Sequence, residues 1–362
     1  MSENPPDRTS NRPDQGNTPT VFLVGFKPWK VFMPRWLPES HVVRCATGIL
    51  SLPDFLRRIP QILRSRSSAI YVWSYTAPWY VELLCRFYSV PLVRVEDGFL
   101  RSVGFGSEQT PPLSLCFAKK ALYFDATVES DLEHILLSYD FESSPELIHR
   151  ARRGISALVS SRISKYNAGR AADVQVLYGP KTKPRILIVG QVEGDMSMKK
   201  GMRRQLTNNA FVREVVAENP HAQVIYKPHP EVLRGLRRRP RQSNPDEVRE
   251  ICLVLNEDIA LADAFETVDR VYTMTSLSGF EALIRGIPVT CFGSPFYSGW
   301  GATEDRESCP RRTARRTVEA IFAAAYILYP QYRHPSSGEP LEFEEALELL
   351  QRMVGDNRSM ST

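Results

Sequence analysis

The chain has 362 residues, of which 43% are hydrophobic and 24% are charged, and its formal net charge is +5. This composition is that of a globular protein with material for two domains of ordinary size. It excludes a transmembrane helix, because no run of about 18 apolar residues occurs.

The N-terminal 18 residues are polar and proline-rich, and they lack the apolar core of a signal peptide. We therefore expect residues 1–18 to form a disordered tail on a cytoplasmic protein. The six cysteines are scattered, with no CxxC pair, and we expect them to be reduced and buried instead of binding a metal.

Short apolar runs alternate with longer helical patterns along the whole chain, which predicts an α/β fold with helices on both faces of parallel sheets. The polar, proline-bounded segment 179–184 divides the chain into two halves. Residues 318–329 and 342–353 have helical spacing and are expected to brace the first domain. The expected strands are 21–24, 69–73, 92–95 and 122–124 in the first half and 185–189, 222–226, 270–274 and 289–292 in the second, with helices at 209–218 and 259–265.

Basic residues cluster at 234–241 and at 311–316. Both clusters suggest an anionic neighbour such as a lipid surface, a nucleotide or nucleic acid, and solvated loops are the alternative. No nucleic-acid-binding motif accompanies either cluster, so we expect no nucleic-acid partner.

Adjacent carboxylates, Glu96 and Asp97, leave an apolar strand just before a glycine. Neighbouring carboxylates push one another's pKa values apart, so one can serve as a base while the other orients it. The alternative is a turn with a solvated acidic pair.

Glycines at 190 and 194 enclose the first loop of the second half, and Asp195 follows them. The glycines let the backbone turn sharply and approach a ligand closely. Asp195 is then placed to act on an anomeric carbon, as a nucleophile or by stabilising positive charge, or else it is the N-cap of a following helix.

His229 stands between two prolines at the end of another strand, with Lys227 nearby. The prolines restrict the backbone, so the imidazole projects in a fixed direction. Fixed donors of this kind suit a phosphate leaving group, whose developing charge they neutralise.

Ser276, Ser278 and Glu281 lie where the strand ending near residue 274 runs into a helix. Backbone N–H groups and hydroxyls at such a junction suit an anionic phosphate. A capping box between Ser278 and Glu281 is the alternative. The glycine- and aromatic-rich loop at 293–301 is suited to line a sugar or base pocket, or it is a packed surface loop.

These motifs resemble those of the KpsC-type capsule polysaccharide β-Kdo transferases over about residues 20–335. Typical members carry two such modules in a longer chain, whereas this chain has one. The matching segments are 95–106 (VEDGFLRSVGFG), 111–115 (PPLSL), 123–127 (YFDAT), 164–167 (SKYN), 190–195 (GQVEGD), 226–231 (YKPHPE), 275–289 (TSLSGFEALIRGIPV) and 292–301 (FGSPFYSGWG).

The resemblance implies two Rossmann-like doubly wound domains facing a cleft, the GT-B arrangement. The expected division is a tail at 1–18, an acceptor-side domain at 19–180, a CMP-sugar-binding domain at 181–322 and C-terminal helices at 323–362. It further implies a retaining enzyme that moves Kdo from CMP-β-Kdo onto a (lyso)phosphatidylglycerol-linked Kdo acceptor in capsule linker synthesis. Such an enzyme would work in the cytoplasm at the inner membrane, alone or with other capsule assembly proteins, and without a metal or other cofactor.

By motif matching, Asp195 resembles the nucleophile that forms a covalent Kdo adduct, while Glu96 and Asp97 activate or position the acceptor. The expected donor contacts are Gln191, Lys227, His229, Ser276, Ser278 and Glu281, and the possible acceptor or sugar contacts are Arg101, Ser102, Tyr297 and Trp300.

The same arrangement also resembles that of bacterial sialyltransferases, in which the acidic residue of the corresponding motif is the base of a single inverting displacement. Glu96 or Asp97 would have that role here. A different class of function also stays open, namely a non-catalytic module that binds nucleotide or anionic lipid as a partner in capsule export.

Overall fold

The computed structural model describes residues 18–45, 52–64, 67–104, 109–165, 167, 169–233, 235 and 242–359. By its internal contacts the chain forms two compact units, Met1–Val93 and Arg94–Thr362. None of the helices in the described ranges is both long and apolar enough to cross a membrane.

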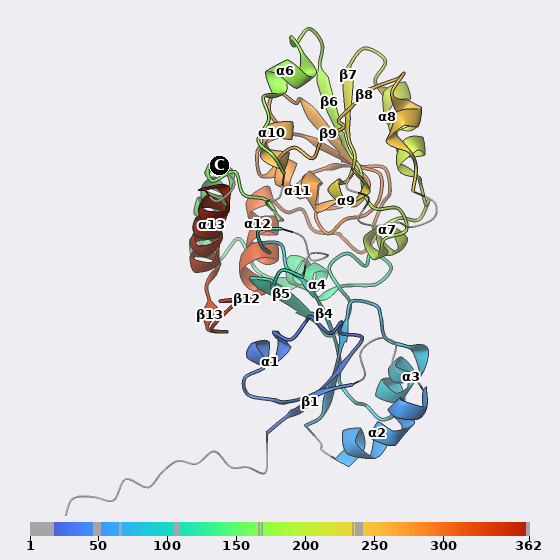
Figure 1. The fold of residues 1–362 in the computed structure, drawn as a ribbon, viewed down its shortest axis with the longest axis vertical. Helices are drawn as coiled ribbons and strands as arrows, with labels where there is room; N and C mark the ends of the chain where they lie inside the picture. Colours follow the sequence, from blue (N-terminus) through green and yellow to red (C-terminus); the bar gives the residue numbers. More distant parts are fainter. Residues whose placement is uncertain are drawn as a thin grey trace, which may run out of the picture. The chain divides into compact units, whose positions relative to one another are not determined.

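The first unit is built on three parallel strands, in which β1 (Thr20–Val24) lies between β2 (His41–Arg44) and β3 (Ala69–Trp73). Phe22 at the centre of β1 is fully buried, as expected for a strand with a neighbour on each side. The helices are α1 (Met33–Trp36), α2 (Leu52–Arg64) and α3 (Trp79–Phe87). Figure 1 shows α2 and α3 next to each other on one side of the strands, and their buried residues share one core with β1 and β3.

The second unit contains an antiparallel set of strands in the order β13-β12-β5-β4. Their bounds are β4 (Leu92–Asp97), at whose start the two units meet in the sequence, β5 (Ser114–Ala118), β12 (Gln331–Arg333) and β13 (Pro340–Leu341). Helices α4 (Asp131–Ser138), α5 (Pro145–Ser160) and α6 (Val174–Tyr178) follow β5 along the chain.

The expected strand at 122–124 is wrong, and so is the expectation that every strand of the first half is parallel. The strand is β5 instead, and it runs antiparallel to β4. After β5 the Asp131 carboxylate accepts the backbone N–H groups of residues 119–121, which turns the chain away from the ladder. Leu122 is fully buried although it is not part of a strand, so its apolar character wrongly predicted a strand there.

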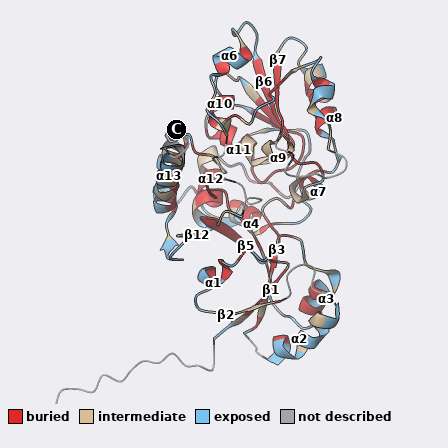
Figure 2. Cartoon of the chain, in the orientation of Figure 1, coloured by how far each residue is buried: buried red, intermediate tan, exposed pale blue. Residues whose placement is uncertain are grey.

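A six-stranded parallel sheet forms the rest of the second unit, in the order β11-β10-β9-β6-β7-β8. Every residue of β6 is buried, as Figure 2 shows in red. The strands are β6 (Arg185–Val189), β7 (Gln223–Lys227), β8 (Leu253–Val254), β9 (Arg270–Thr273), β10 (Val289–Cys291) and β11 (Glu304–Asp305). Four of them match the expected strands closely.

Strand β6 has β7 on one side and β9 on the other, so the strand order reverses beside it. In doubly wound sheets, ligands bind outside the carboxyl ends of the strands at such a reversal. The helices of this part are α7 (Met196–Gly201), α8 (Asn208–Glu218), α9 (Pro230–Leu233), α10 (Leu261–Ala264) and α11 (Leu277–Leu283), with a 3₁₀ turn at Pro245–Val248.

The C-terminal helices pack on elements of the expected first domain, as predicted. Helix α12 (Val318–Phe322) continues into a π-helix (Ala323–Leu328) and packs on α5. The long helix α13 (Phe343–Ser359) follows, and a Cβ atom on Gly154 of α5 would lie only 2.8 Å from the Phe343 ring. The predicted division near residue 180 falls between α6 and β6, and its use as a domain boundary stays a prediction.

Four of the six cysteines, Cys45, Cys85, Cys116 and Cys291, are buried, and Cys252 and Cys309 are half-buried. Burial raises the pKa of the Cys116 and Cys291 thiols, so both are protonated at neutral pH. They behave as small apolar core residues.

Candidate functional site

The loops that follow β6 and β9 are joined by buried hydrogen bonds. The Gln191 side chain accepts the backbone N–H of Thr275 at 2.7 Å and donates to the Thr275 hydroxyl at 3.0 Å. Gly190 is required behind it, since a Cβ atom there would lie 2.9 Å from the Tyr226 hydroxyl. The first loop of the parallel sheet is therefore fixed to the loop that leads into Ser276, at the reversal of strand order.

Asp195 lies directly before α7 and follows Gly194, which turns the chain with a φ of +75°. In the described structure Asp195 occupies the N-cap position, yet its side chain makes no capping hydrogen bond. The neighbouring Glu193 has the structural role instead, because its buried carboxylate accepts the backbone N–H groups of Asn208 and Ser243. The N-cap alternative thus explains the position of Asp195 in the chain, and its half-buried carboxylate does not cap the helix.

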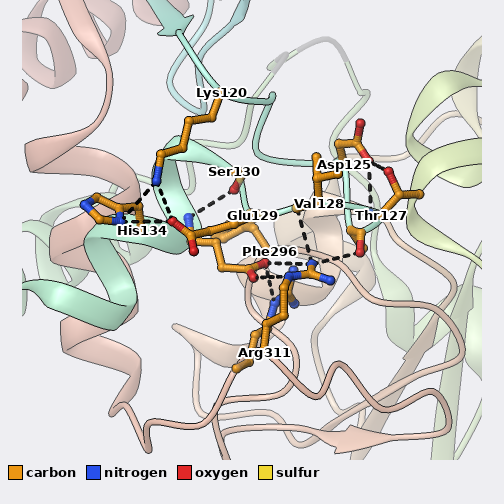
Figure 3. A network of polar contacts seen from close by, with 12 residues as sticks. Lys120, Asp125, Thr127, Val128, Glu129, Ser130, His134, Phe296 and Arg311 are labelled. Atoms are coloured by element: carbon orange, nitrogen blue, oxygen red, sulfur yellow. Dashed lines mark hydrogen bonds and ion pairs between the residues drawn. The ribbon is translucent and has the colours of Figure 1, made fainter.

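Contacts at its far end hold the Asp195 helix. The Lys200 ammonium lies 3.3 Å from the buried Asp125 carboxylate, and the Lys200 carbonyl accepts the N–H of Ala126 at 3.1 Å. Figure 3 shows Asp125 and Thr127 beside one another, with the Arg311 side chain reaching Val128. The segment at 123–127 is thereby tied to α7.

Three arginines of the basic cluster at 311–316 have internal partners. Arg311 and Arg312 each pair with the buried Glu133 carboxylate, at 2.9 and 3.1 Å. Arg316 donates to the carbonyl of Leu136 at 2.7 Å. The expectation of an external anion at this cluster is therefore wrong for these three side chains. In the other predicted cluster, residues 234 and 236–241 lie outside the described residues.

Lys227 is the last residue of β7, and His229 follows it two residues later. The buried Lys227 ammonium lies 3.5 Å from the Asp258 carboxylate. The Nδ1 atom of His229 accepts the backbone N–H of Glu231 at 3.2 Å. A neutral imidazole that accepts at Nδ1 carries its proton on Nε2, which is then a hydrogen-bond donor of fixed direction.

Ser276 is the N-cap of α11, where its hydroxyl accepts the N–H of Ser278 and lies 3.2 Å from the Ser278 hydroxyl. The alternative capping box between Ser278 and Glu281 is wrong, because Glu281 turns the other way. Its Oε1 atom accepts the backbone N–H of Lys165 at 3.1 Å.

Glu281 is only 3% exposed, and its Oε2 atom has no hydrogen-bond partner among the described residues. Burial raises the pKa of this carboxyl to about 7, against the opposing effect of the Arg285 guanidinium and of the Lys165 backbone. The group therefore changes its charge near neutral pH.

The acidic pair at the end of β4 is not a solvated turn. Asp97 is buried, and its Oδ2 atom lies 2.8 Å from Nε of the fully buried Arg101. Arg101 also donates to the Ser102 hydroxyl at 2.6 Å. Glu96 is half-buried and accepts the N–H of Asp97. Within this pair, Asp97 forms a buried ion pair with Arg101, whereas Glu96 is half-buried.

Lys165 connects the end of β4 with α11, and the motif analysis did not single it out as a site residue. Its backbone donates to Glu281 and accepts the N–H of Ser102, and its ammonium lies 3.4 Å from the Tyr123 hydroxyl. Tyr123 donates in turn to the carbonyl of Asp97 at 3.3 Å. Tyr123 and Lys165 lie in the segments 123–127 and 164–167 that match the family, and this match could have identified them as site residues.

Tyr297 and Trp300 are buried. The Tyr297 hydroxyl donates to the Ser276 carbonyl and the Trp300 indole N–H donates to the Phe296 carbonyl. Their rings pack in the aromatic core, so they support the Ser276 junction from behind. Among the described residues, no three His, Cys, Asp or Glu side chains are grouped to hold a metal ion.

The fold and these contacts define an α/β protein whose polar side chains meet at the carboxyl edge of a parallel sheet. A family model described as "Capsule polysaccharide biosynthesis protein" matches residues 69–332, and the chain belongs to this family.

Relatives of known name match most of the chain. The lipopolysaccharide-processing protein LpsZ of Rhizobium meliloti is 42% identical over 91% of this chain and 73% of its own length. The capsule polysaccharide modification protein LipA of Neisseria meningitidis serogroup A is 36% identical over 92% of this chain. The chain spans only 45% of LipA, so it corresponds to part of that protein.

Two solved structures are similar over nearly the whole chain. The β-Kdo 2,4 transferase of Thermosulfurimonas dismutans KpsC is 32% identical with a TM-score of 0.76, covering 92% of this chain and 98% of its own. The β-Kdo 2,7 transferase of the same protein is 31% identical with a TM-score of 0.72, covering 92% of this chain and 99% of its own. These matches confirm the predicted α/β, GT-B-like fold class.

Proposed function

We propose that the chain is a retaining glycosyltransferase that moves Kdo from CMP-β-Kdo onto a (lyso)phosphatidylglycerol-linked Kdo acceptor in capsule linker synthesis. The observation that carries the proposal is the similarity along almost the whole chain to two β-Kdo transferases, at 31–32% identity. Since both belong to KpsC and are named for different linkages, 2,4 and 2,7, the linkage made here does not follow from either.

Asp195 is the nucleophile of the proposed reaction. One carboxylate oxygen attacks the anomeric carbon of Kdo, the bond from that carbon to the phosphate oxygen breaks, and CMP leaves. An acceptor hydroxyl then attacks the same carbon, its proton passes to a base, and the bond to Asp195 breaks. Two inversions give net retention. The fixed turn at Gly194 and the anchoring of α7 through Lys200 support this role, because a nucleophile must be held in place.

Glu96 is the base we favour for the second step. Asp97 lies 2.8 Å from the Arg101 guanidinium, and an ion pair of this kind lowers the basicity of a carboxylate. Arg101 and Ser102 then act by holding Asp97 and the end of β4, from which Glu96 projects. The single-displacement mechanism of the sialyltransferases would use the same Glu96 without an adduct on Asp195, and the experiment below separates the two.

The donor phosphate is proposed to bind between His229 and the hydroxyls of Ser276 and Ser278. The His229 Nε2–H and the two hydroxyls are donors that suit the charge of a departing CMP. Gln191 and Lys227 act from behind, since they are bonded to Thr275 and Asp258. Glu281 is proposed to lie on the ribose or base side of the donor. No metal or cofactor takes part in this scheme.

Intact-mass spectrometry of the protein with CMP-Kdo generated in situ, without acceptor, tests the nucleophile. We expect a Kdo-sized adduct that is lost in Asp195→Ala. Asp195→Asn should lower turnover at least about a thousandfold while CMP binding persists. Asp173→Asn is the matched control, because Asp173 caps another short helix and asparagine caps equally well.

Near-normal turnover of Asp195→Asn would remove Asp195 from the nucleophile role. Turnover without an adduct, abolished by Glu96→Gln, would favour the inverting mechanism. A non-catalytic module would give neither product nor adduct. For a transferase that uses a CMP-sugar, CMP but not UMP should raise the melting temperature, with a stabilisation of about 2.7 kcal/mol at a concentration one hundred times Kd. A module that binds only lipid would respond to anionic vesicles and not to CMP.

A further inference from the structure

Helix α3 in the first unit is apolar on the face that it turns to solvent. Trp79, Leu83 and Phe87 are 71%, 56% and 77% exposed, and their spacing of four residues places them in one stripe along the helix. The opposite face, with Val81 and Leu84, is buried in the core. A helix that is apolar on both faces is expected inside a core or against a second apolar phase.

Helix α2 presents a similar stripe and also carries exposed arginines. Leu52, Leu56 and Leu63 are 44%, 54% and 37% exposed, while Phe55 on another side of the helix is buried. At 100° per residue, the three leucines fall within one narrow sector, and the exposed Arg57 and Arg64 lie about 80–100° further round the helix from its edge.

The two stripes belong to neighbouring helices. The rings of Phe55 on α2 and Tyr80 on α3 are 5.3 Å apart, and Figures 1 and 2 show the two helices next to each other with exposed outer faces. Of the thirteen large hydrophobic side chains that are exposed in the described ranges, eight belong to the first unit. The apolar residues are thus concentrated on one unit instead of being scattered singly.

We propose that this α2–α3 face docks on the surface of an anionic phospholipid bilayer. Leucine, tryptophan and phenylalanine beside arginine are the side chains of an interfacial helix, whose apolar face enters the boundary between headgroups and acyl chains. Arg57, Arg64 and Arg86 meet the negative headgroups, and Asp54 and Glu82 are the acidic residues nearby. The choice of partner rests in part on the proposed function, which requires a lipid-linked acceptor.

The charges argue against a second copy of the chain as the occupant. In a twofold-symmetric dimer the same patch is present on both sides, so the arginines of the two copies would be brought together. A bilayer that contains acidic lipid offers the opposite charge to the same arginines, and an apolar phase to the stripe between them.

Co-sedimentation of the full-length protein with vesicles of phosphatidylcholine, with and without phosphatidylglycerol, tests the proposal. We expect binding that needs phosphatidylglycerol and weakens with salt. Trp79→Ser with Phe87→Ser should weaken binding on the order of tenfold, and Arg57→Glu with Arg64→Glu by at least about fivefold for each arginine. The matched controls are Val176→Ser, which is 79% exposed on α6, and Arg213→Glu, exposed on α8, and both should bind normally.

Equal binding of the patch variants and the controls would overturn the proposal, and so would a lack of wild-type binding to either vesicle. A wild-type dimer in size-exclusion chromatography that Trp79→Ser dissociates would overturn it in favour of a second copy. Kdo transfer to a short water-soluble acceptor separates this proposal from the proposed function. The patch variants should keep that transfer. If the wild type shows no transfer but binds vesicles through the patch, the proposed function is rejected and the proposed membrane-binding surface is retained.

Discussion

Helices α11 and α3 lie in comparable places, each after a strand of an α/β layer, and they differ in what they bury. Helix α11 buries five of its seven residues, including the carboxyl of Glu281, whereas α3 buries three of nine and exposes Trp79 and Phe87. Around α11 polar groups are fixed by burial and hydrogen bonds, which preorganises a site. Around α3 apolar groups are left to solvent, which folding alone does not require. Four measurements test this contrast.

The largest loss of stability is expected from Glu133→Gln, in the buried region. Glu133 is the shared partner of Arg311 and Arg312, and its removal leaves two guanidinium groups without their counter-charge. Breaking a buried pair typically costs about 3–5 kcal/mol, measured here as the free energy of unfolding in urea. Glu342→Gln is the control, since Glu342 is 73% exposed beside Arg150 and should cost at most about 1 kcal/mol. Equal losses would show that the Glu133 pair is no better protected than a surface pair.

Glu281→Gln should make stability less dependent on pH. The native carboxyl has a pKa of about 7 against an ordinary value of 4.5, so between these values the folded state holds a proton that the unfolded state has lost. Stability of the wild type therefore falls as pH rises through this window, by up to about 3 kcal/mol.

The glutamine variant keeps an acceptor for the Lys165 N–H and has no proton to lose. The melting temperature of the variant minus that of the wild type should increase between about pH 4.5 and pH 7. Above that range this difference should be constant. A difference that does not change with pH would mean that the Glu281 carboxyl titrates normally.

Gly279→Ala tests how closely the site is packed. A Cβ atom at Gly279 would lie 2.2 Å from the Tyr297 hydroxyl and 2.8 Å from the Thr273 methyl, so the Ser276 junction must shift. The expected cost is about 1–3 kcal/mol by thermal unfolding, together with weaker CMP binding. At Gly355 no described atom lies within 4 Å of the added methyl, and Gly355→Ala should instead stabilise by up to about 1 kcal/mol.

The smallest effect on stability is expected in the first unit. Trp79→Ser should change the free energy of unfolding by no more than about 0.5 kcal/mol, because the side chain is 71% exposed. Val81→Ser, two residues further along the same helix, removes a fully buried side chain and should cost several times more. If both variants unfold equally easily, Trp79 is part of the core and the contrast with α11 fails.

The local sequence pattern was sufficient to predict a strand where all residues of the strand are buried or half-buried. The apolar run at 185–189 coincides with β6, and the strands at 69–73 and 270–274 were placed within one residue. It failed at 122–124, where Leu122 is buried and Tyr123 and Phe124 are half-buried without forming a strand, and at β5, whose serine and cysteine obscured the apolar pattern of a strand. Side-chain burial and ladder hydrogen bonds are separate requirements, and a short apolar run reports only the first.

By itself the sequence determined the α/β alternation, the family, and the positions of Asp195, His229 and Ser276 at strand ends, because these depend on neighbours a few residues apart. Only the tertiary structure decided that Glu281 binds Lys165, 116 residues away, that Asp97 is held by a buried Arg101, and that Glu133 neutralises two arginines of the basic cluster. The partner of a buried charge depends on which distant segment packs against that charge. Because a buried charge without a partner costs several kcal/mol of stability, the folded structure must provide such a partner.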